Sequence, residues 1–134
     1  MNADEVQRLV QQANAADAAA AATLVRTFDC DRHLAVYGTL APGEPNHHQL
    51  APCRGQWAHG QVRGRRAVRT FPVFTYDPTA PWVPVQWLAS TALPQHWRRL
   101  EEFEGDEYRR ILVPVFAAGQ LVTVANLFAA VDPV

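Results

Sequence analysis

The sequence LAVYGTLAPGEPN, residues 34–46, organises the predictions for the rest of the chain. Its first four residues predict an apolar strand that ends at Gly38, and the prolines and glycine of residues 42–45 predict a turn-rich loop. Glycine lets the backbone approach other groups closely or take a positive φ. The amides of residues 38–40 can then converge into a hollow that suits a carboxylate or a phosphate. Because such a junction is also typical of an ordinary turn, a second stretch is needed to indicate a site.

That second stretch is LEEFEGDEYRR, residues 100–110, at the end of a predicted helix. The helix is expected to begin near Ser90 or Thr91 as its cap and to end at Gly105. By their spacing, its apolar face holds Leu93, Trp97, Leu100, Phe103 and Glu104. A carboxyl group on the apolar side of a helix is unusual, and it makes Glu104 the candidate for acid–base chemistry.

Three causes are expected to raise the pKa of Glu104: its apolar face, the negative end of its helix, and the nearby carboxylates of Asp106 and Glu107. Arg109 or Arg110 would lower this pKa again. A carboxyl group with a pKa near neutrality can both accept and donate a proton, as a combined general base and acid must. The alternative is a glutamate that ends the helix or pairs with Arg109 and has no chemical role.

Length and composition predict a folded protein with its own core, since 49% of the 134 residues are hydrophobic and 19% are charged. The net charge of −1 argues against a nucleic-acid surface, and we interpret the arginine run at 63–69 as a solvated strand or loop face. Without a recognisable export signal or membrane-spanning run, we expect a cytoplasmic protein that binds neither nucleic acid nor membrane. Cys30 and Cys53 lack the spacing of a disulfide framework, and we expect both to be reduced and partly buried.

The N-terminal segment, residues 1–29, is predicted to be a helical extension of a domain that covers residues 30–134. One helix is expected from residue 1 to about residue 28, with Asn2 and Glu5 as a capping box and an apolar stripe on one side. This extension would pack on the domain or cover its pocket, or it would contact a second copy of the chain or another protein.

The domain itself is predicted to consist mainly of short strands separated by turns. The expected strands cover residues 33–37, 56–62, 68–76, 83–88, 109–116 and 121–128. A single helical turn is expected at 47–52, and a hairpin turn joins the last two strands.

No metal or cofactor is expected from the motifs. The histidines fall in separate elements without the spacing of a zinc site, and the chain has neither a phosphate loop nor a dinucleotide-binding glycine pattern. Cys53 and Ser90 lack the neighbours that would activate a nucleophile, so covalent catalysis has no candidate either.

Taken together, the two stretches resemble the γ-glutamylcyclotransferase family, in its AIG2-like and γ-glutamylamine cyclotransferase branch. The likeness rests on VYGTL at 36–40, on Pro42-Gly43 and Asn46-His47, and on the pattern L-x-x-F-E-G-x-x-Y-x-R at 100–110. It runs from about Leu34 to Phe128. The resemblance implies an α+β fold, a small mixed β-barrel of five or six strands with flanking helices, to which the N-terminal helix would be an addition.

The resemblance also implies a cofactor-independent enzyme with a small-molecule γ-glutamyl substrate. The implied substrate-binding residues are Tyr37, Gly38, Thr39, Leu40 and Tyr108, with the backbone of residues 38–40 holding the α-carboxylate. Glu104 would take a proton from the α-ammonium group of the substrate. The freed amine would attack its own γ-carbonyl, and Glu104 would protonate the leaving amine, giving 5-oxoproline. Such a ring closure depends on positioning more than on an activated nucleophile.

Three features depart from the family pattern. The N-terminal helix precedes the usual start, residues 65–73 lack the Gly-Tyr-Pro-like segment of many relatives, and Glu101 stands where an aspartate is common. These departures leave the amine half of the substrate open. The alternative from another functional class is a non-catalytic module that binds a small ligand or a partner on the same fold.

Overall fold

The computed structural model, which describes residues 1–134, contains six strands in one sheet. They are β1 (His33–Val36), β2 (Gln56–Val68), β3 (Pro72–Tyr76), β4 (Trp82–Ala89), β5 (Tyr108–Ala117) and β6 (Gln120–Ala130). Their order is β3-β2-β4-β1-β6-β5, and a pairing of β2 with β5 between Gln61 and Phe116 closes five of them into a barrel. The pair β1–β6 is parallel and the other pairs are antiparallel. The predicted α+β fold with a small mixed barrel is therefore confirmed.

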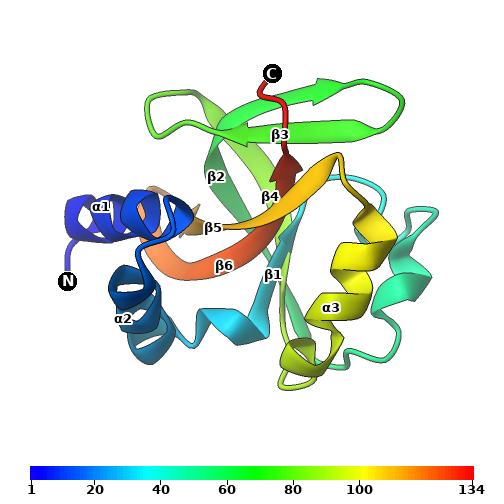
Figure 1. Ribbon diagram of the computed structural model, residues 1–134, viewed down its shortest axis with the longest axis horizontal. Coiled ribbons are helices and arrows are strands. Elements are labelled where there is room, and N and C mark those ends of the chain that lie inside the picture. Colours follow the sequence, from blue (N-terminus) through cyan, green and yellow to red (C-terminus); the bar gives the residue numbers. More distant parts are fainter.

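Strand β2 is longer than predicted and forms a hairpin with β3 over one end of the barrel (Figure 1). The prediction ended this strand at Val62 and began the next at Val68. In the structure, β2 pairs with β3 from Gly64 to Val68, so the turn lies at residues 69–71. Arg63, Arg65 and Arg66 of the arginine run lie in this strand, where alternating positions place their side chains on two faces. Arg69 lies in the turn.

Strands β1 and β6 are buried on both faces, because the barrel interior lies on one side and helices lie on the other. In β1, Ala35 packs inside the barrel while Leu34 and Val36 pack outside it, against α3 (Leu93–Glu104). This alternation points the next residue, Tyr37, toward the interior cluster, where its ring lies beside that of Phe74.

Helix α3 covers this outer face through Leu93, Trp97 and Leu100, which are buried as predicted. Phe103 was wrongly placed on the same face, since it is 39% exposed. The helix ends at Gly105, whose φ of 80° is a conformation that glycine adopts easily.

The N-terminal segment forms two helices, α1 (Ala3–Asn14) and α2 (Ala18–Phe28), instead of the single helix that the sequence predicted. The break occurs because Ala16 takes a φ of 72° and the Asp17 carboxylate caps α2 by accepting from the N–H groups of Ala19 and Ala20. Asn2 caps α1 as expected. Both helices lie on the side of the barrel away from α3, as Figure 1 shows.

Two short 3₁₀ helices complete the fold, η1 (Cys30–Arg32) and the predicted turn η2 (His47–Leu50). Cys30 and Cys53 are both buried and unpaired. No helix combines the length and the apolar character that crossing a membrane requires.

Candidate active site

A small cavity of about 40 Å³ lies where the end of β1, the end of α3 and the start of β5 meet. Its lining is mostly apolar and includes Val36, Leu40, Pro72 and Phe128, with Glu104 as the one ionisable carboxyl group. One water molecule needs roughly 10–15 Å³ of such volume. A larger ligand must therefore extend out of the cavity.

An open groove of about 330 Å³ lies beside the cavity, and residues of the Tyr37–Thr39 segment line both. The cavity and the groove share this segment and Pro72 as a common wall. The groove is more polar than the cavity, since Glu44, His59 and Arg66 line it. A ligand could place one end beside Glu104 and the other in the groove.

The backbone of residues 38–40 offers N–H groups without partners. None of the amides of Gly38, Thr39 and Leu40 donates a hydrogen bond within the protein. Because half-buried N–H groups are normally paired, this run is suited to receive an anion from outside the chain.

Gly38 serves a close approach here and not a positive φ. A Cβ atom at this position would lie 3.1 Å from the Cβ of Pro72, which forms the opposite wall of the cavity. The absence of a side chain therefore lets the β1 end and the start of β3 come together.

The segment is held in place by side chains that contact its carbonyl and hydroxyl groups. Asn46 donates from Nδ2 to the Thr39 hydroxyl at 3.0 Å and from its backbone N–H to the Thr39 carbonyl at 2.9 Å. The His47 ring lies 2.9 Å from the Leu40 carbonyl. These contacts give a structural reason for the Asn46-His47 part of the sequence motif, since they leave the amides of the segment free.

Glu104 reaches the cavity because it extends the buried stripe of α3 by one further turn after Leu100. It makes no ion pair and no hydrogen bond in the structure, so the alternative of a pair with Arg109 is not found. Burial alone raises the pKa of Glu104 from 4.5 to about 7. The predicted direction is confirmed, but the helix end and the neighbouring acids are not needed to explain it.

Arg110, the other cation that could have lowered this pKa, is engaged elsewhere. Its Nε donates to the Glu101 carboxylate at 3.2 Å and its Nη1 to Asn126 at 2.9 Å. Its guanidinium also lies over the Trp97 ring, 4.5 Å from the centroid. Arg110 thus ties α3 to the barrel and leaves Glu104 without a counter-charge.

Two tyrosines brace the cavity through hydrogen bonds to backbone carbonyls. The Tyr37 hydroxyl donates to Phe128 at 2.5 Å, and the Tyr108 hydroxyl donates to Pro72 at 2.8 Å. Burial, and to a smaller extent the Glu104 carboxylate, raise the pKa of Tyr108, and burial also raises that of Tyr37. Both phenols therefore stay neutral at physiological pH and act as fixed walls.

The structure brings all of the predicted site residues to this one cavity, namely Tyr37, Gly38, Thr39, Leu40, Glu104 and Tyr108. The sequence predictions missed Phe71, Pro72 and Phe128, which complete the lining. Arg66 is exposed, as the interpretation of the arginine run as a solvated face implied, but the sequence predictions did not show that it lines the groove. The sequence did hold an indication for Arg66. It lies four residues after Val62, so the two side chains leave the strand on the same side, and that of Val62 points into the barrel.

Comparisons with known proteins address the fold and the family. A family model described as "Gamma-glutamyl cyclotransferase, AIG2-like" matches residues 34–131. A search of curated proteins found no match. The family match begins within β1, so α1 and α2 lie outside it.

Solved structures share the fold at low sequence identity. An AIG2-like protein of Mus musculus has a TM-score of 0.51 and 24% identity, over 75% of this chain and 77% of that one. An uncharacterized protein of Pyrococcus horikoshii has a TM-score of 0.56 and 18% identity, over 76% and 80% of the two chains. YkqA of Bacillus subtilis reaches a TM-score of 0.61 at 21% identity, but the match covers 76% of this chain and 36% of YkqA.

Proposed function

The chain belongs to the AIG2-like family of γ-glutamyl cyclotransferases, and from this premise we propose that it converts a γ-glutamyl amide into 5-oxoproline and a free amine. One observation carries the proposal most strongly: an unpaired, half-buried carboxyl group, Glu104, faces a cavity whose other wall presents the free amides of residues 38–40. An acid–base group and an anion-binding backbone are the two parts that this reaction needs.

The glutamyl group would bind with its α-carboxylate on the amides of Gly38, Thr39 and Leu40, where three donors can neutralise its charge. Its α-ammonium group would then lie near Glu104, and the γ-carbonyl would point back toward the groove. Fixing the chain in this folded shape brings the nitrogen and the carbonyl carbon together, which supplies much of the rate of a five-membered ring closure.

Glu104 would act twice as a proton carrier. In its charged form it takes a proton from the α-ammonium group, and the freed amine attacks the γ-carbonyl carbon. The bond from this carbon to the leaving nitrogen then breaks as that nitrogen receives a proton from Glu104. The nitrogen of the new ring then gives its second proton to Glu104, which passes it to the departing amine. The amine therefore leaves as an ammonium ion, and Glu104 returns to its charged form.

A pKa near 7 suits this role, because the carboxyl group can exchange protons in both directions at neutral pH. The apolar walls contributed by Leu40, Pro72 and Phe128 provide the burial that raises it. No metal or cofactor is required by the scheme, since every step is a proton transfer or an acyl transfer within the substrate.

A panel of γ-glutamyl amines and γ-glutamyl amino acids, assayed for 5-oxoproline, tests the proposal directly. Release of 5-oxoproline with the stoichiometric amine is the expected result. Free glutamate as the product would indicate hydrolysis and would contradict ring closure. Binding of the compounds without turnover would favour the non-catalytic ligand-binding module instead.

A further inference from the structure

Arg66 differs from the other arginines of its run in where it points. Positions 62, 64 and 66 of β2 share one side of the strand, and the side chain of Val62 packs inside the barrel. By residue 66 the strand has passed the barrel end, so the same side faces the groove, and Arg66 lines it. Arg66 is therefore the one arginine of the groove beside the cavity.

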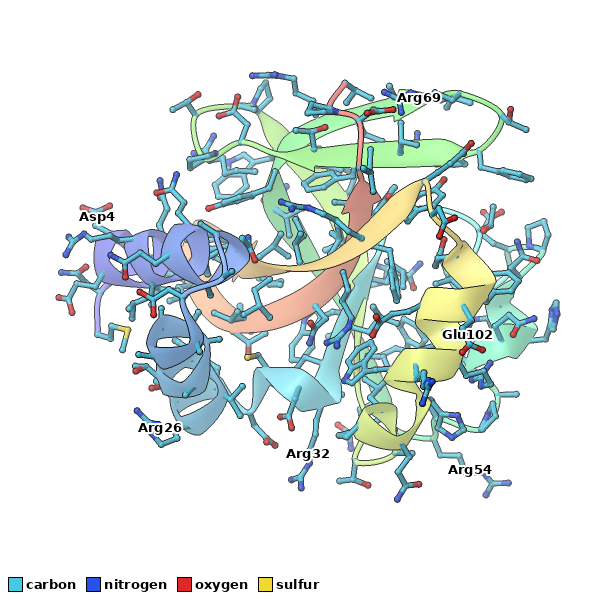
Figure 2. All side chains as sticks on the ribbon, in the orientation of Figure 1. Asp4, Arg26, Arg32, Arg54, Arg69 and Glu102 are labelled. Atoms are coloured by element: carbon cyan, nitrogen blue, oxygen red, sulfur yellow. The ribbon has the colours of Figure 1, made fainter.

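The neighbouring arginines have their own partners away from the groove. Arg63 lies over the Trp82 ring at 3.8 Å, and Arg65 pairs with Asp77. Arg69, labelled at the β2–β3 hairpin in Figure 2, donates to the backbone carbonyls of Asp132 and Pro133. Arg66 makes no ion pair, and only its Nε is used, donating to the Tyr37 carbonyl at 3.2 Å.

This single hydrogen bond fixes the guanidinium at the boundary between groove and cavity. Tyr37 O belongs to the same peptide group as the amide of Gly38, which is one of the free donors. The two Nη atoms of Arg66 have no acceptor in the protein. They can therefore bind a carboxylate in the groove through two parallel hydrogen bonds, the geometry in which a guanidinium is most selective.

We infer that Arg66 selects substrates whose leaving amine carries a carboxylate close to its nitrogen, as in a γ-glutamyl amino acid, over uncharged γ-glutamyl amines. The inference rests on the proposed function, because it takes the glutamyl half to lie in the cavity. Glu44 also lines the groove and would favour an ammonium group. The Glu44 side chain makes no hydrogen bond or ion pair, whereas Arg66, which is also exposed, is anchored by its hydrogen bond to the segment that would hold the substrate.

Three substrates whose leaving groups carry a negative, no and a positive charge test this selection: γ-glutamyl-alanine, γ-glutamyl-alaninamide and γ-glutamyl-ethylenediamine. We expect kcat/KM for γ-glutamyl-alanine to exceed that for the alaninamide by about tenfold, the typical effect of one partly exposed charge pair with two hydrogen bonds. In Arg66→Gln this ratio should fall toward one, and Arg66→Lys should retain part of it. Arg65→Gln is the matched control on the same strand and should keep the wild-type ratio.

An unchanged ratio in Arg66→Gln, or a wild-type preference for the ethylenediamine compound, would overturn the inference and leave cyclisation intact. If no compound yields 5-oxoproline, the proposed function fails instead. Calorimetric binding of γ-glutamyl-alanine and γ-glutamyl-alaninamide to Glu104→Gln and to the double variant with Arg66→Gln then decides the selection separately. Tighter binding of γ-glutamyl-alanine than of γ-glutamyl-alaninamide to Glu104→Gln, lost in the double variant, supports the inference. Equal binding of the two compounds to both proteins refutes it.

Discussion

Glu104 and Tyr108 line the same cavity from the two sides of the turn at Gly105, Glu104 as the last residue of α3 and Tyr108 as the first of β5. The Tyr108 N–H donates to the Gly105 carbonyl at 3.2 Å, which closes this turn. The spacing E-G-x-x-Y therefore has a geometric meaning. It places a carboxyl group and a phenol side by side where a helix gives way to a barrel strand.

The first prediction concerns turnover. Glu104→Gln keeps the shape of the side chain and removes its proton exchange, so kcat should fall by about 10²–10⁴-fold while substrate still binds. The measurement is steady-state release of 5-oxoproline together with calorimetric binding. Turnover close to that of the wild type would remove Glu104 from the mechanism.

The control for this variant is Glu102→Gln, because Glu102, labelled on α3 in Figure 2, is exposed and makes only a long contact of 3.7 Å with Arg98. Glu101 is also exposed, but it is a less suitable control. The structure shows that it pairs with Arg110, so its replacement would also loosen the contact of α3 with the barrel.

The pH dependence of catalysis should follow the pKa of Glu104. Because the charged carboxylate must accept the first proton, kcat/KM should fall as pH decreases through about 7. The measurement is a pH profile of kcat/KM between pH 5 and pH 9, in buffers of constant ionic strength. An acidic limb near the ordinary value of 4.5 would show that burial does not tune this group in the free enzyme.

The same shift predicts a pH-dependent stability. The folded-state pKa of about 7 exceeds the ordinary value of 4.5, so between these values the folded chain binds the proton more tightly than the unfolded chain. The free energy of unfolding should therefore decrease as pH rises through this window, by up to about 1.4 kcal/mol per pH unit from this group. Glu104→Gln should lack this component and should be more stable than the wild type at pH 8. Denaturant titrations of both proteins at pH 5 and pH 8 measure the difference, and equal slopes with pH would contradict it.

The barrel could be predicted only through the family resemblance, whereas the local elements followed from the residues themselves. Alternation and turn residues located β1, α3 and the hairpin of the last two strands. The predicted cap of α3 at Ser90 or Thr91 was wrong, since Ala92 is the N-cap and no side chain caps the helix. These patterns did not show that Gln61 pairs with Phe116, because a contact between distant strands that closes a sheet leaves no local pattern. They also missed the break at Ala16, since alanine has a high helix propensity and its left-handed φ depends on how α1 and α2 pack against the barrel.

The site residues divide in the same way, into those that local sequence patterns could place and those that depend on contacts between distant strands. Glu104 could be placed from its spacing along α3, and the backbone segment of residues 38–40 from its glycine. The partners on other strands could not be placed in this way. Pro72 and Arg66 lie on β3 and β2, and they reach the cavity and groove only because the β2–β3 hairpin folds over the barrel end. A strand boundary misplaced by a few residues was enough to hide that Arg66 lines the groove.

Gly38 should tolerate no side chain without a loss of substrate binding. Its φ is not positive, so alanine meets no backbone strain, but the added Cβ would lie 3.1 Å from Pro72 and push apart the two walls of the cavity. We expect Gly38→Ala to raise KM by about tenfold or more while the melting temperature changes little. Gly43→Ala is a poor control because Gly43 has a φ of 83°. An unchanged KM would show that the segment can shift without affecting the ligand.

The last prediction separates the N-terminal helices from catalysis. Asn14 at the end of α1 pairs with the backbone of β5: its Nδ2 donates to the Leu112 carbonyl and its Oδ1 accepts from the Leu112 N–H, both at 2.9 Å. Neither α1 nor α2 contributes a residue to the cavity. Asn14→Ala leaves both backbone groups without a protein partner, which should lower the free energy of unfolding by about 1–3 kcal/mol.

Because the cavity lies away from this contact, kcat and KM of Asn14→Ala should match the wild type at a temperature where both proteins are folded. The matched control is Gln12→Ala, which removes a similar amide from an exposed position of α1 and should change neither stability nor activity by much. Denaturant unfolding gives the stability, and 5-oxoproline release gives the activity.

A loss of activity without a loss of stability would mean that the helices act on the site after all. In that case the N-terminal segment would have to be counted as part of the catalytic unit, since the packing of Val6, Val10 and Leu24 against the barrel would then transmit its effect.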